Sequence, residues 1–284
     1  MDKLLKISEL ILSEHNTGIP FKNLEKPLIL NNEDEAYNAQ FIFQKNAKRG
    51  KIGGYKIALA SKVQQQLCSI NNPIAGGVFK KEIYQSSKSL NLNNFNSLGI
   101  EFEVAFEINQ DILPVTFDDK NIEIKNYINR AYACLELIDD RNASYINLDA
   151  LTLIADNAWS AGVILGNPIK NWENLDLNQL NSKLYWNNEL IGESKLLNTD
   201  PLNSLGWVIG HLCKYNKKID KGCIIISGSL LKTKKPLYSI GGINNENIIN
   251  LKKMGYKKFA ISNGVYAFED HEIKNIIKIN NEGN

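Results

Sequence analysis

The sequence predicts a mixed α/β fold in three parts, and three observations favour it. Residues 1–80 alternate helical segments with a glycine-flanked strand. Residues 81–235 carry frequent short apolar runs, which are typical of strands. Residues 236–284 return to a strand–helix–strand–helix periodicity. We therefore expect a small N-terminal α/β unit, a strand-rich central domain and a βαβα tail in this chain of 284 residues.

Helix signals dominate the N-terminal unit. We expect an amphipathic helix from Asp2 to about Glu14, which a glycine and a proline then end. A second helix should lie in "EDEAYNAQFIFQKNAKR", where acids crowd the start and bases the end, as the helix dipole favours. The segment "GKIGGYKIAL" predicts a strand, and Ser61 is positioned to cap a short helix, "KVQQQL".

Strand signals dominate the central domain. Strict alternation in "EFEVAFEI" predicts a half-buried strand, and "NIEIKNYINRAYACLELI" begins like a helix and ends as a short apolar strand. Further strands are expected in "AGVILG" and "CIIISGSL", and a hairpin in "LYWNNELIGES" with Asn187 and Asn188 at its turn. Between them, "DPLNSLGWVIGHLCKYN" predicts a helix with Asp200 as its cap and proline at its first position.

The tail predicts two strands and two helices. "KPLYSI" and "KKFAIS" have the apolar character of strands. "NENIINLKKM" predicts a helix that Gly255 ends, and "EDHEIKNIIKI" predicts a final helix.

Composition argues against several functional classes. The net charge is +2, which gives no reason to expect binding to nucleic acid or to a membrane surface. No stretch approaches the roughly 18 apolar residues of a membrane span. The first residues mix acids into an apolar pattern, unlike a signal peptide. The cysteines form no CxxC or close pair and are typical of reduced thiols, so we expect a cytoplasmic protein; they are Cys68, Cys134, Cys213 and Cys223.

The glutamates of "EFEVAFEI" need an explanation, because like charges on one strand face repel. One interpretation is a solvated face on which they do nothing. The other is a metal site, since Glu101 and Glu103 place two carboxylates on one strand face and hard divalent cations bind carboxylate oxygens. Glu136, a lone acid between apolar residues in "CLELIDDR", could supply a third ligand or be an exposed glutamate.

Six stretches, in this order, carry a resemblance: "GGYKIALASKVQQQL", "GIEFEVAFEI", "ACLELIDDR", "ADNAWSAGVILG", "DPLNSLGWVIGHL" and "GCIIISGSL". From about residue 7 to 234 the chain resembles the 2-keto-4-pentenoate hydratase group of the fumarylacetoacetate hydrolase superfamily. The resemblance implies a mixed β-roll as the core of the central domain. It also implies a Mg²⁺ or Mn²⁺ site made by Glu101, Glu103 and Glu136, with Glu107 left to solvent.

The resemblance further implies a metal-dependent hydratase that acts on a 2-oxo or 2-hydroxydienoic acid, such as 2-hydroxypenta-2,4-dienoate. A decarboxylase of the 4-oxalocrotonate type, an acylpyruvate C–C hydrolase and a metal-binding protein that has lost turnover are the alternatives. Lys56 matches the group's lysine and is expected to steady the enolate or relay a proton. We expect Lys56, Ser61 and Ser160 to contact the substrate, and the chain to form a homo-oligomer.

Two positions depart from the group's pattern. Ile74 stands where many hydratases have an aspartate proposed as an acid/base, and Trp159 stands where relatives often have serine or alanine. The tryptophan would shrink a pocket if it points inward. Asp156 and Asn157 are expected to hold the turn before it, and His15 to be a surface or packing histidine.

The tail departs most from the pattern of the hydratase group. Residues 235–270 resemble the last two β/α units of thiamine phosphate synthase, in which a "GGI" turn holds phosphate. Nothing upstream supplies the other units that such a barrel needs. We therefore expect the tail to be structural, to dock on the strands of 100–230, and to form no independent thiamine-type site.

Overall fold

The protein is described here by a computed structural model, which covers residues 2–117, 123–186 and 189–229. Beyond these it describes the backbone of five short strands, at 231–232, 239–240, 259–260, 263–269 and 272–278. The turn residues Asn187 and Asn188 and the tail helix predicted over 245–254 lie outside the described residues.

The predicted helices of the first 230 residues are confirmed. They are α1 (Lys3–Thr17), α2 (Glu33–Asn46), α3 (Lys62–Leu67) and α5 (Pro201–Lys214), with a further short helix α4 (Ala150–Ala155). Asp2 caps α1 by accepting a hydrogen bond from the amide of Leu4, and Gly18 ends it in the left-handed conformation. Ser61 forms a capping box with Gln64 at α3, whereas the Asp200 side chain makes no capping bond to α5.

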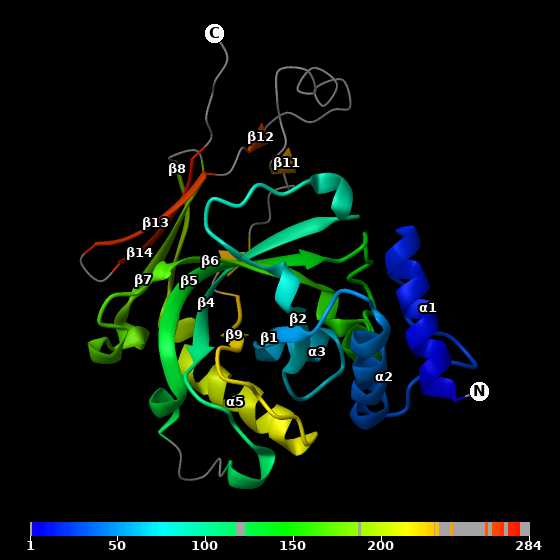
Figure 1. The fold of residues 1–284 in the computed structure, drawn as a ribbon. Helices are drawn as coiled ribbons and strands as arrows, with labels where there is room; N and C mark the ends of the chain where they lie inside the picture. The colour runs from blue at the N-terminus through cyan, green and yellow to red at the C-terminus, as the bar shows by residue number, and fades with distance from the viewer. Residues whose placement is uncertain are drawn as a thin grey trace.

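One curled, mixed sheet of eight strands forms the body of the molecule (Figure 1). Its strand order is β2-β1-β9-β4-β5-β6-β3, with β10 paired to β4. The strands are β1 (Ile52–Ala58), β2 (Ile74–Phe79), β3 (Ile83–Gln85), β4 (Leu98–Ile108), β5 (Ile128–Asp139), β6 (Ser160–Pro168), β9 (Ile224–Ile226) and β10 (Leu231–Lys232). Strands β1 and β2 of the expected N-terminal unit thus belong to the same sheet as the central strands, and the boundary at residue 80 stays a prediction.

Strand β5 is longer than expected. The sequence predicts a short strand at the end of its segment, but β5 runs for 12 residues and pairs with β4 along its length. Only Ile124–Tyr127 is helical before it, as one 3₁₀ turn. The alternating side chains of β5 find buried partners on both sheet faces, and this tertiary packing outweighs local helix propensity.

Three buried hydrophobic clusters form around the sheet, and two of them include helices. The first lies between its inner face and α5, and includes Phe102, Phe106 and Leu137 of the sheet with Leu205 and Ile209 of the helix. The second packs α1, α2 and α4 against the β2 end of the sheet, where Figure 1 shows the two N-terminal helices lying side by side. None of the helices in the described ranges is long and apolar enough to cross a membrane.

A hairpin, β7 (Asn181–Trp186) and β8 (Glu189–Lys195), forms a second sheet with two tail strands, β13 (Asn263–Glu269) and β14 (Glu272–Lys278). Strand β14 pairs in parallel with β7, which agrees with docking of the tail on the central domain. The final helix predicted over 269–279 is wrong, because β14 occupies this segment: it is rich in β-branched isoleucine, and strands on both sides satisfy its backbone.

The two apolar segments predicted as tail strands contain β11 (Ser239–Ile240) and β12 (Phe259–Ala260), which pair in parallel. A parallel pair is the arrangement that a strand–helix–strand unit produces. The connection between these strands, including the "GGI" turn, lies outside the described residues. The absence of an independent thiamine-type site in the tail therefore stays a prediction.

Candidate metal centre and its cavity

The pairing of β4 with β5 brings three glutamates together. Glu101 lies directly opposite Glu136 in the antiparallel ladder, so their side chains project from the same face. Glu103 lies two positions further along β4 and projects from that face as well. One carboxylate oxygen from each residue lies within 4.8 Å of the other two. The three residues predicted as metal ligands therefore form a compact cluster.

Two of the three glutamates are buried and Glu101 is half-buried, which contradicts the solvated-face interpretation. Glu103 is 0% exposed and Glu136 is 1% exposed. Glu103 Oε2 accepts a hydrogen bond of 2.7 Å from the backbone N–H of Gly228, whose φ of 100° suits glycine. The other oxygen of Glu103 and Oε2 of Glu136 have no hydrogen-bond donor in the described part of the chain, whereas Oε1 of Glu136 pairs with Lys56. Buried carboxylate oxygens without donors are rare and costly, so they call for a ligand.

Lys56 supplies the nearest positive charge. It projects from β1, is 3% exposed, and forms an ion pair with Glu136 Oε1. Glu107, the third glutamate of β4, lies at the other end of the strand and is only partly exposed, because it accepts hydrogen bonds from Tyr132 and Asn129. Its predicted exposure to solvent is thus only partly correct.

The single ammonium of Lys56 compensates the three carboxylates only in part. Burial raises the pKa of the Glu103 carboxyl well above its usual range, and Glu136 beside it raises this pKa further. Burial also raises the pKa of Glu136, although the ammonium of Lys56 acts in the opposite direction. Burial alone would lower the pKa of Lys56, but the carboxylates of Glu136 and Glu101 outweigh it and raise the pKa.

The donor set fits a hard divalent cation. When all four side chains are ionised, three carboxylates and one ammonium leave two negative charges in the site, which one divalent cation balances. All candidate ligand atoms are oxygens, and their 4.8 Å spread is close to the roughly 4–5 Å between opposite ligands of Mg²⁺ or Ca²⁺. Binding would also give the orphaned oxygens of Glu103 and Glu136 a partner.

A cavity of about 230 Å³ opens beside the cluster. Lys56, Glu101, Gly228 and Ser229 line its polar part, and Ser61 lines it at the start of α3. The rest of the wall is largely apolar and includes Leu59, Leu67, Ile138, Leu148, Leu153 and Trp159. The predicted substrate contacts Lys56 and Ser61 thus face this cavity.

Ser160 does not line the cavity among the described residues. It is 4% exposed at the start of β6, and its hydroxyl has no hydrogen-bond partner there. Its carbonyl oxygen accepts a hydrogen bond of 3.0 Å from Arg49. A direct contact of Ser160 with substrate stays a prediction.

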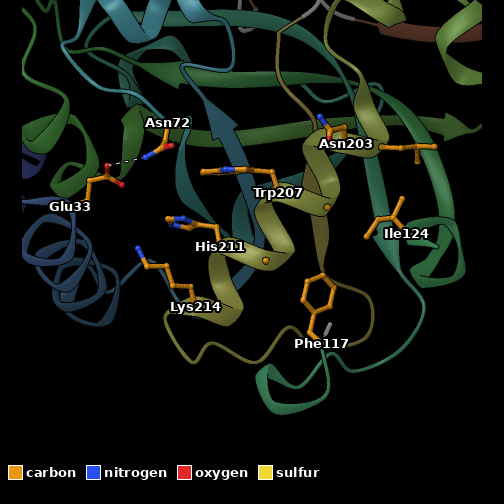
Figure 2. A pocket seen from close by; sticks show the side chains of 11 residues that line it. Glu33, Asn72, Phe117, Ile124, Asn203, Trp207, His211 and Lys214 are labelled. Carbon is orange, nitrogen blue, oxygen red and sulfur yellow. Dashed lines mark hydrogen bonds between the residues drawn. The ribbon is translucent and has the colours of Figure 1, made fainter. Parts of the chain in front are cut away.

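A larger groove of about 680 Å³ follows α5, and none of the predicted site residues line it. Figure 2 shows Trp207 and His211 of α5 pointing toward Asn72, and Phe117 and Ile124 on the other side of the helix. In the described residues, no cluster of potential metal ligands lies in this groove. The smaller cavity, which lies beside the carboxylate cluster, is therefore the candidate substrate site.

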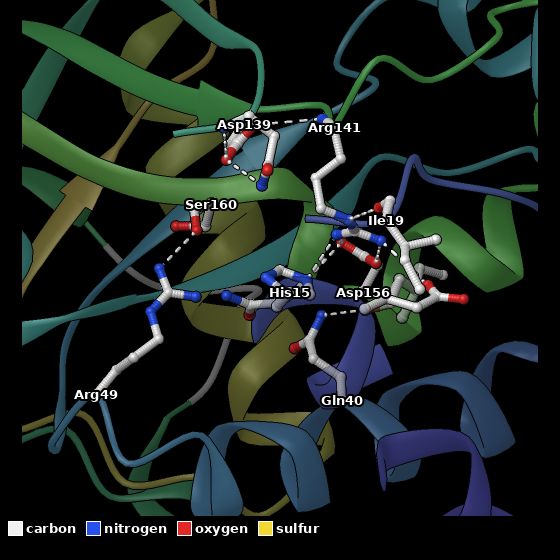
Figure 3. A network of polar contacts seen from close by, with 12 residues as sticks. His15, Ile19, Gln40, Arg49, Asp139, Arg141, Asp156 and Ser160 are labelled. Carbon is white, nitrogen blue, oxygen red and sulfur yellow. Dashed lines mark hydrogen bonds and ion pairs between the residues drawn. The ribbon is translucent and has the colours of Figure 1, made fainter. Parts of the chain in front are cut away.

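Sequence reasoning missed a buried charge network behind the cavity wall (Figure 3). Arg141 is 1% exposed and donates to both oxygens of Asp156, at 2.9 and 2.8 Å. His15 lies 3.1 Å from Asp156 and 2.7 Å from Arg141, which agrees with its predicted packing role. Asp156 thereby anchors the turn that leads to Trp159. The "LIDDR" stretch showed an arginine but gave no sign of its burial.

The fold and the donor set define a class: an α/β protein with a three-carboxylate centre, largely buried and suited to a divalent cation, beside a small cavity. No family model matches the chain. Two curated relatives are the 2-oxo-hept-4-ene-1,7-dioate hydratase of Escherichia coli, 29% identical over 74% of this chain and 80% of that protein, and the 2-keto-4-pentenoate hydratase of Paraburkholderia xenovorans (strain LB400), 26% identical over 75% and 80%.

The fold is that of a solved structure, 4-oxalocrotonate decarboxylase from Pseudomonas putida G7, complexed with calcium and acetate. The TM-score is 0.70 at 20% identity, over 84% of this chain and 90% of that one. The same protein complexed with magnesium and adipate gives a TM-score of 0.71 at 20% identity, over 83% and 90%. The chain is thus a relative of these hydratases and shares the decarboxylase fold, which confirms the predicted α/β class with a curled mixed sheet.

Proposed function

We propose that this chain is a divalent-metal-dependent hydro-lyase that adds water to a 2-hydroxydienoic acid or its 2-oxo tautomer. The observation that carries the proposal is the cluster of Glu101, Glu103 and Glu136 at a small cavity beside Lys56, in which the buried Glu103 and Glu136 each keep an oxygen without a donor among the described residues. The hydratase relatives, which match about three quarters of the chain, support the reaction class.

The three glutamates would hold the cation. When bound, a Mg²⁺ or Mn²⁺ ion would supply a Lewis acid for the substrate's C1 carboxylate and C2 oxygen. Lys56 lines the cavity beside these ligands, so its ammonium can pair with the substrate carboxylate and donate a hydrogen bond to the oxygen at C2. Ser61 contributes a hydroxyl at the same wall, and the apolar side chains limit the water in the cavity.

A decarboxylase remains the second candidate because of Ile74. This side chain is 0% exposed in the core between α2 and β2, and it does not line the cavity. An isoleucine cannot move a proton, so this chain lacks the aspartate that is proposed as an acid/base in many hydratases. Loss of carbon dioxide from the distal carboxylate of an unsaturated 2-oxo diacid sends the electron pair into the C2 oxo group, so it passes through a similar dienolate and needs no added water.

An assay with 2-hydroxypenta-2,4-dienoate, a hydroxymuconate-type diacid and an acylpyruvate separates the candidates. The proposal expects loss of the dienoate absorbance with formation of the hydrated 2-oxo acid, dependent on Mg²⁺ or Mn²⁺. Release of carbon dioxide from the diacid without hydration would favour the decarboxylase. The homo-oligomer and the cytoplasmic location stay predictions, which gel filtration and cell fractionation would test.

A further inference from the structure

Trp159 sits on an unusual backbone. Asn157, Ala158 and Trp159 have successive φ values of 65°, 52° and 55°, all in the left-handed region, and none is glycine. A run of such residues is uncommon for L-amino acids and tends to occur where the surrounding structure imposes it for function. The indole N–H of Trp159 is also buried without a hydrogen-bond partner in the described part of the chain. The fold therefore tolerates two unfavourable features to place this side chain.

Neighbouring groups fix this turn firmly. The side-chain amide of Asn157 exchanges hydrogen bonds with the backbone of Gly77, at 2.7 and 2.8 Å. A Cβ atom at Gly76 would lie 2.6 Å from the Asn157 carbonyl oxygen, so the turn can approach β2 only because glycine is there. Asp156, just before the turn, is held by Arg141. The position of Trp159 is thus preorganised.

The ring of Trp159 closes the apolar part of the cavity. It is 7% exposed, and it packs edge-on against Phe21 at 5.3 Å and close to edge-on against Tyr145 at 5.5 Å between ring centroids. These contacts hold the ring in place. The cavity of about 230 Å³ is below the roughly 300–1,000 Å³ typical of sites for drug-sized ligands. A ligand whose head occupies the polar end thus has little room for a tail.

The apolar part also lacks a partner for a second carboxylate. Of the side chains described in the wall, Lys56 is the cation, and it is already paired with Glu136 at the metal end. Around Trp159 the wall consists of Leu148, Leu153, Ala158 and Tyr145, whose hydroxyl already donates to Asp140. The other polar side chains of the wall, which include Gln64, Asn198 and Thr199, carry no positive charge. A buried carboxylate among these groups would be unpaired, which is strongly unfavourable.

We propose that Trp159 is a specificity-determining residue, which restricts the site to 2-oxo monocarboxylic acids with a short uncharged tail and excludes dioates. The inference rests on the proposed function and names its substrate class. It distinguishes this chain from its relative named for a heptenedioate, although that relative is 29% identical. The acid head binds at the polar end, and the tail ends against the indole ring.

Two measurements test the proposal. The first is calorimetry of the Mg²⁺-loaded protein with 2-oxopentanoate and 2-oxoheptanedioate, which need no turnover. The second is the ratio of kcat/KM for 2-hydroxypenta-2,4-dienoate to that for 2-hydroxyhepta-2,4-diene-1,7-dioate. We expect the wild type to favour the monoacid at least about tenfold in both, the scale of one badly accommodated group. Trp159→Ser should bring both ratios close to one, because the dioate should bind and react better in the enlarged cavity. Trp159→Phe should leave both ratios at their wild-type values.

The outcomes separate this inference from the proposed function. Selective binding of the monoacid without turnover would support the selectivity inferred for Trp159 and would refute the proposed hydratase activity. Turnover of both dienoates at similar kcat/KM would refute the inference alone. An unchanged preference in a folded, metal-binding Trp159→Ser protein would show that another residue sets the selectivity. If Trp159→Ser fails to fold, the ratios measured for the wild type still test the substrate preference. If the wild type binds neither acid, both the proposed function and the inference about Trp159 are refuted.

Discussion

Lys56 and Glu136 form an ion pair in which both side chains are almost fully buried, 3% and 1% exposed. They come from different strands of one sheet, β1 and β5, and β9 and β4 lie between these strands in the sheet order. Such a pair is costly to desolvate and by itself is weak evidence for stability. Its position beside two further glutamates at a cavity wall instead indicates a functional site.

The first prediction concerns metal affinity. Replacing Glu103 or Glu136 with glutamine removes a charged ligand, so the affinity for Mg²⁺ or Mn²⁺ should fall at least about tenfold. Glu107→Gln is the matched control, because Glu107 lies on the same strand but bonds to Tyr132 and Asn129 instead. Isothermal titration measures all three variants. Unchanged affinity in both ligand variants would contradict the assignment.

The second prediction concerns the role of Lys56. Lys56→Met should lower turnover about 100-fold or more, since a positioned acid or charge contributes on this scale. Lys62→Met, which removes a nearby lysine that bonds to Gln65 in α3, should leave turnover almost unchanged. Near-parental turnover in Lys56→Met with metal binding intact would show that the lysine has no chemical role.

The third prediction concerns stability. Arg141→Met leaves Asp156 buried without its charged partner, so unfolding free energy should drop by about 3–5 kcal/mol. Lys218→Met removes exposed ion pairs with Asp111 and Asp220 and should cost far less, because solvent screens these charges. Urea denaturation of the two variants checks the contrast, and equal losses would contradict the buried network.

The fourth prediction concerns pH. Burial, helped by Lys214, lowers the pKa of His211 to about 4, from an ordinary value of 6.5. Between these values the unfolded chain binds a proton that the folded one does not, so stability is lost as pH falls from about 6.5 to 4. The ring stacks on Trp207 at 4.8 Å, so Phe can replace it.

Urea denaturation at pH 7 and pH 4.5 measures this effect. We expect the wild type to lose roughly 1–2 kcal/mol more than His211→Phe over this interval, after allowance for partial exposure of the ring. Equal losses in the two proteins would mean that His211 does not titrate in the way its burial implies.

The three candidate metal ligands could be predicted because strand periodicity and the resemblance both indicate particular residue positions. Strand alternation placed Glu101 and Glu103 on one face, and the resemblance selected Glu136. The burial of that face could not be predicted, since it depends on the Gly228 loop and on strands β1 and β9, which are distant in sequence. The contact between Lys56 and Glu136 could not be predicted either, because it depends on the order of the strands in the sheet.

Local sequence patterns could not predict two other features, the last strand of the tail and the turn at Trp159. The last tail segment has a composition that both helix and strand tolerate, and only the neighbouring strand β7 decides in favour of β14. The left-handed turn at Trp159 depends on Gly76 and Gly77 of β2, far away in the chain. Trp159 was noticed as a departure, but its inward position required the structure.

The central claim is that Glu101, Glu103 and Glu136 hold a divalent cation that the hydration of a 2-hydroxydienoate requires. The most direct test strips the protein with a chelator and titrates Mg²⁺ back while the absorbance of 2-hydroxypenta-2,4-dienoate is followed. We predict no turnover in the stripped protein, saturable recovery with Mg²⁺, and a saturation point shifted at least about tenfold upward in Glu103→Gln. Full turnover in the stripped protein, or an unshifted curve in a folded Glu103→Gln variant, would contradict the claim.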